Sequence, residues 1–312
     1  MIRTDLAFVF PGQASQVVGM GRSVAAEFPR ARAALDEMDE ALGEKLSAVS
    51  FEGPIEELTL TANAQPAILA TSVAVARAIE SVTDVRPAFV AGHSLGEYSA
   101  LVAARSLDLA SAVRLTRQRG RYMQEAVPAG VGAMAAVMGL DRATLEGLCA
   151  KAAEGEVVSP ANFNAPGQIV IAGHKGAVER VGAAVAAAGG KAVPLKVSAP
   201  FHCALMRPAA ERLAEDLERA EILAPEVPVI TNVGAEPVTD PAAIRELLYG
   251  QVCSPVRWED CVRQLAALGV KIVVEVGPGK VLQGLIKRID KSLRTLGVSD
   301  ADEVRKLASE GI

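Results

Sequence analysis

Short apolar runs alternate along the chain with longer segments of helical periodicity. The first run, Leu6 to Phe10, ends at Pro11-Gly12-Gln13, as a buried strand ends at a tight turn. Further strands are predicted at 88–91, 227–232 and, as the last strand, 271–276; helices are predicted at 22–48, 66–80, 97–104, 108–125, 204–220, 240–249, 258–268 and after 277–279. Strands and helices that alternate in this way are typical of the α/β class.

Residues 128–198 have a different order of elements. The pattern predicts strand 132–138, helix 141–153, strand 156–161, strand 168–172, helix 175–188 and strand 191–197. This β-α-β-β-α-β order is that of a ferredoxin-like domain, and its ends are marked by Pro128-Ala129-Gly130 and Ser198-Ala199-Pro200. We therefore expect residues 128–198 to form a small domain inserted into a large domain of residues 1–127 and 199–312.

Composition narrows the class of protein further. Half of the 312 residues are hydrophobic but only 4% are aromatic, so aliphatic side chains must fill the core, which suits buried parallel strands covered by helices. The net charge is −5 and the chain has no basic block with interleaved aromatic residues. Nucleic acid and anionic membranes are therefore not expected as partners.

The cysteines and the opening residues bear on the cellular compartment. Four cysteines without C-x-x-C spacing are too few for a disulfide framework in 312 residues, so we expect reduced thiols. No signal-peptide pattern opens the chain, and no charge-free apolar stretch is long enough to span a membrane. These features predict a soluble, cytoplasmic protein.

The segment Gly92-His93-Ser94-Leu95-Gly96 lies between a predicted strand and a predicted helix. A G-x-S-x-G pattern in that position places the serine on a sharp turn, with its hydroxyl exposed at the carboxyl end of the strand. The pattern alone is common, so its position between strand and helix carries the interpretation. We predict that Ser94 is a nucleophile; an ordinary serine turn is the alternative.

A serine nucleophile needs a base, and the chain has only three histidines. His93 adjoins Ser94 on the elbow, where neighbouring side chains diverge, so we expect it to pack or hydrogen-bond locally. His174 is expected to face solvent at the start of a helix. His202 is left as the predicted base, in the Ser-then-His order of α/β-hydrolase sites, with a structural histidine as the alternative. Because no acid between Ser94 and His202 lies in a loop that obviously returns to the site, a backbone or amide carbonyl is an alternative partner for the imidazole.

Backbone donors and an arginine suit acyl transfer. The Leu95 N–H, at the start of a helix, is one candidate donor for an oxyanion hole. The Gln13 N–H is the second candidate, with a plain turn as the alternative. Arginines 114, 117, 119 and 121 share the helix predicted at 108–125, and most of them are expected to face solvent. Arg119, near the end of that helix, is the candidate for binding a carboxylate.

Seven motifs occur in order along almost the whole chain. They are Phe10 to Gln13, Gly92 to Tyr98, Arg119 to Gln124, Asn162 to Gln168, Ala199 to His202, Gln251 to Trp258 and Glu275 to Gly279. Together they resemble the malonyl-CoA:acyl carrier protein transacylase family. The resemblance implies an α/β-hydrolase-like large domain with a ferredoxin-like insert. It also implies a serine that takes malonyl from malonyl-CoA and passes it to the phosphopantetheine thiol of acyl carrier protein, without cofactor or metal.

Carried over residue by residue, the resemblance implies a complete catalytic set. Ser94 would be the nucleophile, His202 the base and acid, and Arg119 the clamp on the malonyl carboxylate. The main-chain carbonyl of Gln251 would orient the histidine, which would explain why no acid is found. A buried positive fork would give dicarboxylic acyl units an advantage over acetyl.

The resemblance also implies the residues around the acyl group. Gln13 and Leu95 would supply the oxyanion N–H groups. The side chains expected to contact the substrate are His93, Met123, Asn162 and Phe201. Phe201, next to the histidine, resembles malonyl-selecting relatives, because it would crowd a methyl branch.

Three enzymatic functions fit these motifs. The first is the malonyl transferase of fatty-acid synthesis, and the second is a discrete acyltransferase that serves a polyketide synthase and differs only in its partner. A thioester hydrolase would be favoured only without Arg119 or with an obvious triad acid. A non-enzymatic carrier-binding module is disfavoured because nucleophile, base and clamp are all present. We expect malonyl-CoA and acyl carrier protein as partners, and a monomer.

Overall fold

The computed structural model describes residues 1–197 and 199–312 and contains two β-sheets. The larger, six-stranded sheet has the order β10-β9-β1-β2-β7-β8. Its strands are β1 Ile2–Phe10, β2 Arg86–Gly92, β7 Val229–Ile230, β8 Pro237–Val238, β9 Ile272–Val276 and β10 Arg294–Val298. The strands from β10 to β7 run parallel to their neighbours, and the short β8 pairs antiparallel with β7.

Helices cover both faces of this sheet, so β1 buries side chains on both sides. Leu6, Phe8 and Phe10 belong to one core, and the alternating residues Ala7 and Val9 belong to a second. The first core is shared with α2 Pro29–Leu42, α5 Thr61–Val82, α6 Gly96–Ala103 and α7 Leu109–Glu125, and the second with α12 Trp258–Ala267 and α13 Val281–Ile289. Further helices are α1 Arg22–Glu27, α3 Leu46–Glu52, α4 Ile55–Thr59, η1 Ala204–Met206, α10 Arg207–Arg219, α11 Pro241–Gln251 and α14 Ala301–Ser309. The parallel sheet with two covered faces confirms the predicted α/β class.

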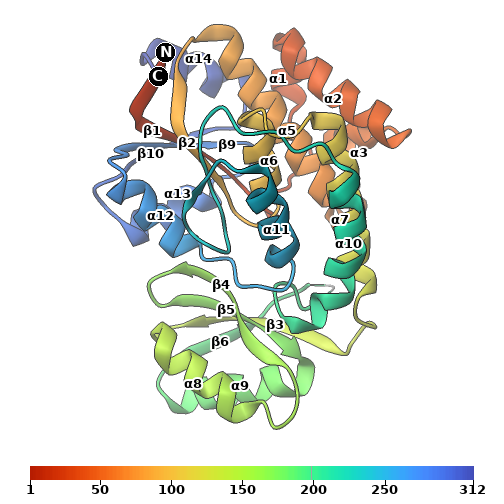
Figure 1. The fold of residues 1–312 in the computed structure, drawn as a ribbon, viewed down its shortest axis with the longest axis vertical. Coiled ribbons are helices and arrows are strands. Elements are labelled where there is room, and N and C mark those ends of the chain that lie inside the picture. The colour runs from red at the N-terminus through yellow and green to blue at the C-terminus, as the bar shows by residue number, and fades with distance from the viewer. Residues whose placement is uncertain (198) are drawn as a thin grey trace.

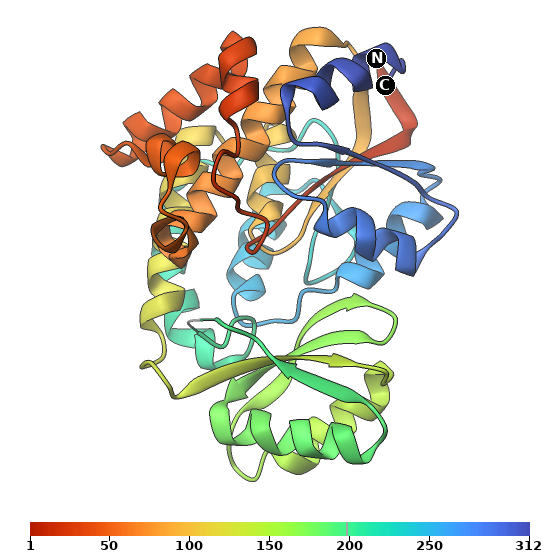
Figure 2. The same cartoon turned by 180° about the vertical axis from the view of Figure 1, so that it is seen from behind.

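The smaller sheet is antiparallel, in the order β4-β5-β3-β6. Its strands and helices are β3 Gly132–Met138, α8 Arg142–Ala152, β4 Val158–Ala165, β5 Gln168–His174, α9 Lys175–Ala187 and β6 Lys191–Pro194. Both helices lie on the face turned away from the larger sheet (Figures 1 and 2). This arrangement confirms the ferredoxin-like part of the fold. The predicted boundary at Ser198 lies outside the described residues, and the division into domains stays a prediction.

Some predicted elements differ from the structure. Helix 22–48 is three helices, because Pro29 begins α2 and Gly43, at a φ of 68°, ends it. Strand 227–232 is only the two-residue β7. The strand at 271–276 is not the last, because β10 and α14 follow it. Most of β10 is only partly buried, and its sequence has no continuous apolar run of the kind that predicts a buried strand.

In the described part of the chain, no helix is long and apolar enough to cross a membrane. The four cysteines, all of them among the described residues, are free thiols in the structure.

A main-chain contact joins β4 to the segment that precedes α12. The Val256 N–H donates to Ala161 O, and the Val256 carbonyl accepts from Phe163 N, both at 2.9 Å. The backbone before α12 therefore pairs with β4 like a short extra strand.

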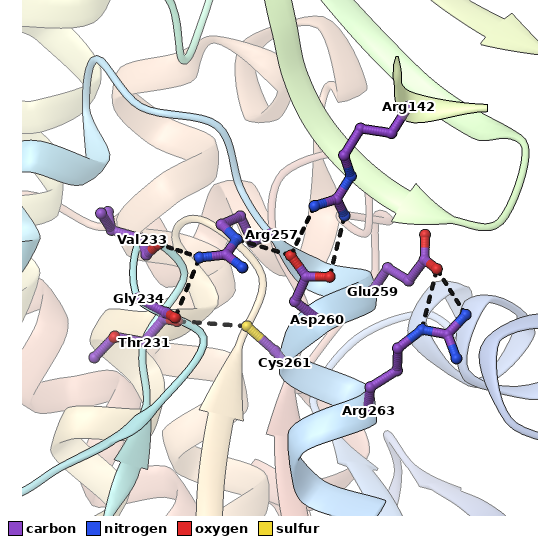
Figure 3. Close-up of polar contacts among 9 residues, drawn as sticks. All are labelled: Arg142, Thr231, Val233, Gly234, Arg257, Glu259, Asp260, Cys261 and Arg263. Atoms are coloured by element: carbon purple, nitrogen blue, oxygen red, sulfur yellow. Dashed lines mark hydrogen bonds and ion pairs between the residues drawn. The ribbon is translucent and has the colours of Figure 1, made fainter. Parts of the chain in front are cut away.

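Charged side chains reinforce this junction. Asp260 of α12 accepts hydrogen bonds from Arg142 of α8 at 3.1 Å and from Arg257 at 2.7 Å (Figure 3). The Arg142 guanidinium also lies 3.9 Å from the ring centre of Phe163. Burial raises the pKa of Asp260, but the bonds from the two arginines outweigh it and hold the pKa below its ordinary value.

We predict that Asp260→Ala lowers the free energy of unfolding by about 1–2 kcal/mol more than Glu259→Ala does. Both acids lie in the first turn of α12, so their helix-dipole contributions are similar. Among the described residues, Glu259 pairs along its own helix, with Arg263 at 2.8 Å, whereas removing Asp260 takes the counter-charge from two arginines (Figure 3). Urea unfolding followed by circular dichroism measures the difference, and equal losses would contradict a role for Asp260 at the junction.

Candidate active site

Ser94 lies on a sharp turn between β2 and α6, with a φ of 51° in the left-handed region. Only glycine fits on either side of it. A Cβ on Gly92 would lie 1.9 Å from Gly96 C, and a Cβ on Gly96 would lie 2.0 Å from Phe10 O. Asn232 holds the turn, because its Oδ1 accepts from Ser94 N and its Nδ2 donates to Gly92 O, each at 2.7 Å. The structure therefore contains the strand-to-helix elbow that the sequence predicts.

His202 lies beside the serine. Its Nε2 is 2.7 Å from Ser94 Oγ, and its Nδ1 is 2.9 Å from the main-chain oxygen of Gln251. Because a carbonyl oxygen can only accept, Nδ1 carries the proton and Nε2 is left to accept from the serine hydroxyl. The partner of the imidazole is thus a backbone carbonyl, the alternative to a carboxylate that the sequence left open.

Burial sets the charge of this imidazole. His202 is 4% exposed, and burial, with the nearby positive charge of Arg119, lowers its pKa to about 3. The ring is therefore neutral at physiological pH, which is the form that can take a proton from the serine.

Arg119 of α7 points toward the same serine. Its side chain is 2% exposed, and its Nη2 lies 3.1 Å from Ser94 Oγ and 2.8 Å from Gln251 Oε1. Its Nη1 donates to Gln65 Oε1 at 2.7 Å. Burial lowers the pKa of Arg119, but a guanidinium stays charged at neutral pH. Among the described residues only neutral oxygens accept from it, so its positive charge is available to an incoming carboxylate.

The other arginines of α7 face away from the serine, as expected for most of them. Arg114, Arg117 and Arg121 line a separate hollow of about 490 Å³, together with Arg219 of α10. Arg117 is paired there with Glu44.

The two predicted oxyanion donors lie on adjoining loops. The loop after β1 packs closely on the elbow, since a Cβ on Gly12 would lie 2.5 Å from His93 O. Within the described residues, neither the Gln13 N–H nor the Leu95 N–H has a hydrogen-bond acceptor. Two unpaired N–H groups near a nucleophile are what an oxyanion hole requires.

A cavity of about 340 Å³ opens beside Ser94, between the two sheets. Its lining includes all the side chains predicted to contact the substrate: His93, Met123, Asn162 and Phe201. His93 also makes the local contacts expected of it, because its Nε2 is 2.8 Å from Asn164 Oδ1 and its ring is 5.8 Å from that of Trp258. His174 does not line the cavity; its Nδ1 accepts from Val157 N at the start of α9.

Three buried polar residues of the site were not assigned a role from the sequence. Gln65 holds Arg119, and its only signal is that it is polar within a largely apolar helix. Asn232 follows β7, at the strand end where α/β sites gather. Glu97 Oε2 accepts from Asn232 N at 2.8 Å and from Gln251 Nε2 at 3.0 Å. Burial raises the pKa of Glu97 to about 7, although these bonds and Arg119 lower it.

The parallel sheet, the serine elbow and the small antiparallel sheet together are those expected of an acyltransferase. In agreement, the family profile of the acyl transferase domain matches residues 7–309. Relatives narrow the assignment within that class.

A malonyl CoA-acyl carrier protein transacylase of Escherichia coli K12 is 53% identical over 95% of this chain and 96% of its own length. The crystal structure of an acyl carrier protein S-malonyltransferase from Vibrio cholerae is 50% identical, with a TM-score of 0.95, over 97% of this chain and 99% of that one. A malonyl-transacylase solved in complex with a type II polyketide acyl-carrier protein is 46% identical, with a TM-score of 0.95, over 98% and 99% of the two chains. The chain belongs to the malonyl CoA-acyl carrier protein transacylase family, as its seven motifs indicated.

We predict that the ring resonances of His202 do not titrate between about pH 8 and pH 5, because its pKa is lowered to about 3. An ordinary histidine would titrate near pH 6.5. Two-dimensional NMR of histidine-labelled protein measures this, with the His202→Asn variant identifying the resonance. A midpoint near 6.5 for that resonance would contradict the buried, neutral imidazole.

Proposed function

We propose that the protein transfers malonyl from malonyl-CoA to the phosphopantetheine thiol of acyl carrier protein through a malonyl-Ser94 intermediate. One observation carries the proposal: Ser94 Oγ lies within hydrogen-bonding distance of both His202 Nε2, at 2.7 Å, and the buried Arg119 guanidinium, at 3.1 Å. A nucleophile placed between a neutral base and a cation suits an acyl group that carries its own carboxylate.

In the first half-reaction, His202 Nε2 takes the hydroxyl proton as Ser94 Oγ attacks the thioester carbonyl of malonyl-CoA. The Gln13 and Leu95 N–H groups donate to the oxyanion of the tetrahedral intermediate. The carbon–sulfur bond then breaks, and the CoA sulfur leaves with the proton from His202. The Gln251 carbonyl supports the imidazolium while it exists, because its hydrogen bond to Nδ1 strengthens when the ring is positive.

The second half-reaction reverses these steps with a different thiol. His202 Nε2 takes the proton from the phosphopantetheine thiol, and the sulfur attacks the malonyl ester. The same N–H groups stabilise the second tetrahedral intermediate, and the bond to Ser94 Oγ breaks as His202 returns the proton. The enzyme is regenerated, and the proposed reaction uses no cofactor or metal.

In this proposal, Arg119 makes the enzyme selective for malonyl over other acyl groups. The guanidinium binds the malonyl carboxylate, an interaction that acetyl lacks. Met123, Asn162 and Phe201 bound the same cavity, and the partly buried Phe201 precedes the base directly, where it crowds a branch at the α-carbon. His93 lines the cavity while its ring is held by Asn164.

The carrier protein is that of fatty-acid synthesis in our proposal, with the enzyme acting as a cytoplasmic monomer. The relative solved with a type II polyketide carrier gives the second candidate, a transferase for a polyketide synthase. Transfer rates to the two kinds of carrier from the source organism separate these candidates.

We predict that incubation with malonyl-CoA adds one malonyl group, and that peptide mapping by mass spectrometry places it on Ser94. The Ser94→Ala variant should gain none. An adduct on another residue, or no adduct during turnover, would show that the reaction follows another mechanism.

We predict that Arg119→Ala lowers kcat/KM for malonyl-CoA by about two to three orders of magnitude, because one partner of a buried charge pair is worth ~3–4 kcal/mol. Use of acetyl-CoA relative to malonyl-CoA should rise. Arg121→Ala, an exposed arginine on the same helix, is the control and should leave the ratio unchanged. An unchanged malonyl-to-acetyl ratio in Arg119→Ala would rule out the clamp.

A further inference from the structure

We infer that Glu97 is a positioning residue that orients the arginine clamp through Gln251 and supports the serine turn through Asn232. The inference deepens the proposed function and rests on it, because it assigns Arg119 the malonyl carboxylate. Among the described residues, Glu97 is hydrogen-bonded to Asn232 and Gln251 and not to Ser94 Oγ or the imidazole of His202, so it acts through its neighbours.

Glu97 lies in the first turn of α6 and is 1% exposed. Its Oε2 accepts two hydrogen bonds, from Asn232 N at 2.8 Å and from Gln251 Nε2 at 3.0 Å. A buried carboxylate is costly unless it is hydrogen-bonded, so each of these donors is part of what keeps it there. The same oxygen thus fixes two residues that come from different segments of the chain.

Gln251 is the first of the two. Its side-chain Nε2 donates to Glu97 and, at 3.0 Å, to Ser94 O, while its Oε1 accepts from Arg119 Nη2 at 2.8 Å. An amide has one donating and one accepting end, and a flip exchanges them. Ser94 O can only accept and the Arg119 guanidinium can only donate, so Nε2 faces Glu97 and Ser94, and Oε1 faces Arg119.

This orientation matters for the clamp. A flipped Gln251 amide would place N–H groups against the N–H groups of Arg119, which would push the guanidinium out of its position. With the amide held by Glu97, Arg119 Nη2 is kept 3.1 Å from Ser94 Oγ, where the acyl group is attached in the intermediate. Glu97, together with the main-chain oxygen of Ser94, therefore fixes which way the amide that holds the clamp faces.

Asn232 is the second residue. Its N–H donates to Glu97, and its side chain spans the elbow, with Oδ1 accepting from Ser94 N and Nδ2 donating to Gly92 O. Ser94 has a φ of 51°, a conformation that a non-glycine residue keeps only when its surroundings hold it. Loss of the Glu97 acceptor would leave a buried N–H of Asn232 without a partner and loosen this support.

The test replaces Glu97 with Met, which has a similar length but no strong acceptor, and with Gln, which keeps an oxygen at the same distance from the backbone. Glu97→Met should lower the ratio of kcat/KM for malonyl-CoA to that for acetyl-CoA about tenfold, and Glu97→Gln should restore most of it. The ratio does not depend on the fraction of folded enzyme, so a purely structural role would not move it.

Asp39→Leu is the matched control. Asp39 is also a buried acid, 4% exposed, that accepts two hydrogen bonds, from Ser47 N at 2.9 Å and Ser47 Oγ at 2.6 Å, whereas the two donors to Glu97 are Asn232 and Gln251. Its variant should unfold at a lower temperature and keep the wild-type ratio.

The outcomes separate the inference from the function on which it rests. If Glu97→Met keeps the ratio while Arg119→Ala lowers it, the clamp stands and the inference about Glu97 is wrong. If Glu97→Gln fails to restore the ratio, the accepting oxygen is not what matters and the inference is also wrong. If Arg119→Ala itself keeps the ratio, the clamp in the proposed function fails first.

Discussion

The hydrogen bond from His202 Nδ1 to the carbonyl of Gln251 is the contact on which the site depends. Gln251 is the last residue of α11, so its carbonyl is one of those that a helix leaves without an internal partner. The carboxyl end of a helix is also its negative end, which favours a partner that becomes positive during reaction. The fold thus orients the imidazole with the carbonyl at a helix terminus, in the place where a carboxylate would otherwise be needed.

The same glutamine also meets the buried arginine, and the two roles are compatible because they use different atoms. The main-chain oxygen serves the histidine, and the side-chain oxygen serves the guanidinium. A cation that is 2% exposed loses most of its hydration. Neutral amide oxygens from Gln251 and Gln65 replace part of that hydration without neutralising the charge, so the arginine keeps its attraction for a carboxylate.

The parts of the candidate site that could be predicted from the sequence are those with a local sequence pattern or a rare residue type. The elbow around Ser94 follows from glycines at fixed spacing, and His202 follows from elimination among three histidines. Gln65 and Asn232 could not be found in this way, because their importance comes from contacts with residues 54 and 138 positions away, Arg119 and Ser94. The edge strand β10 and the helix after it were missed for a related reason, since a half-exposed strand has no continuous apolar run.

The pairing of Val256 with β4 has a consequence for access to the serine. Val256 is five positions after Gln251, which holds the imidazole, and Asp260 in the next turn accepts from Arg142 of α8, the helix that follows β3 of the small sheet. An outward movement of the small sheet would therefore pull on the segment whose carbonyl accepts from the His202 imidazole. These contacts favour a small sheet that stays in place as one wall of the cavity. In the proposed reaction, access of the substrate to Ser94 would then depend on the width of the cavity opening and on the flexibility of the pantetheine chain that passes through it.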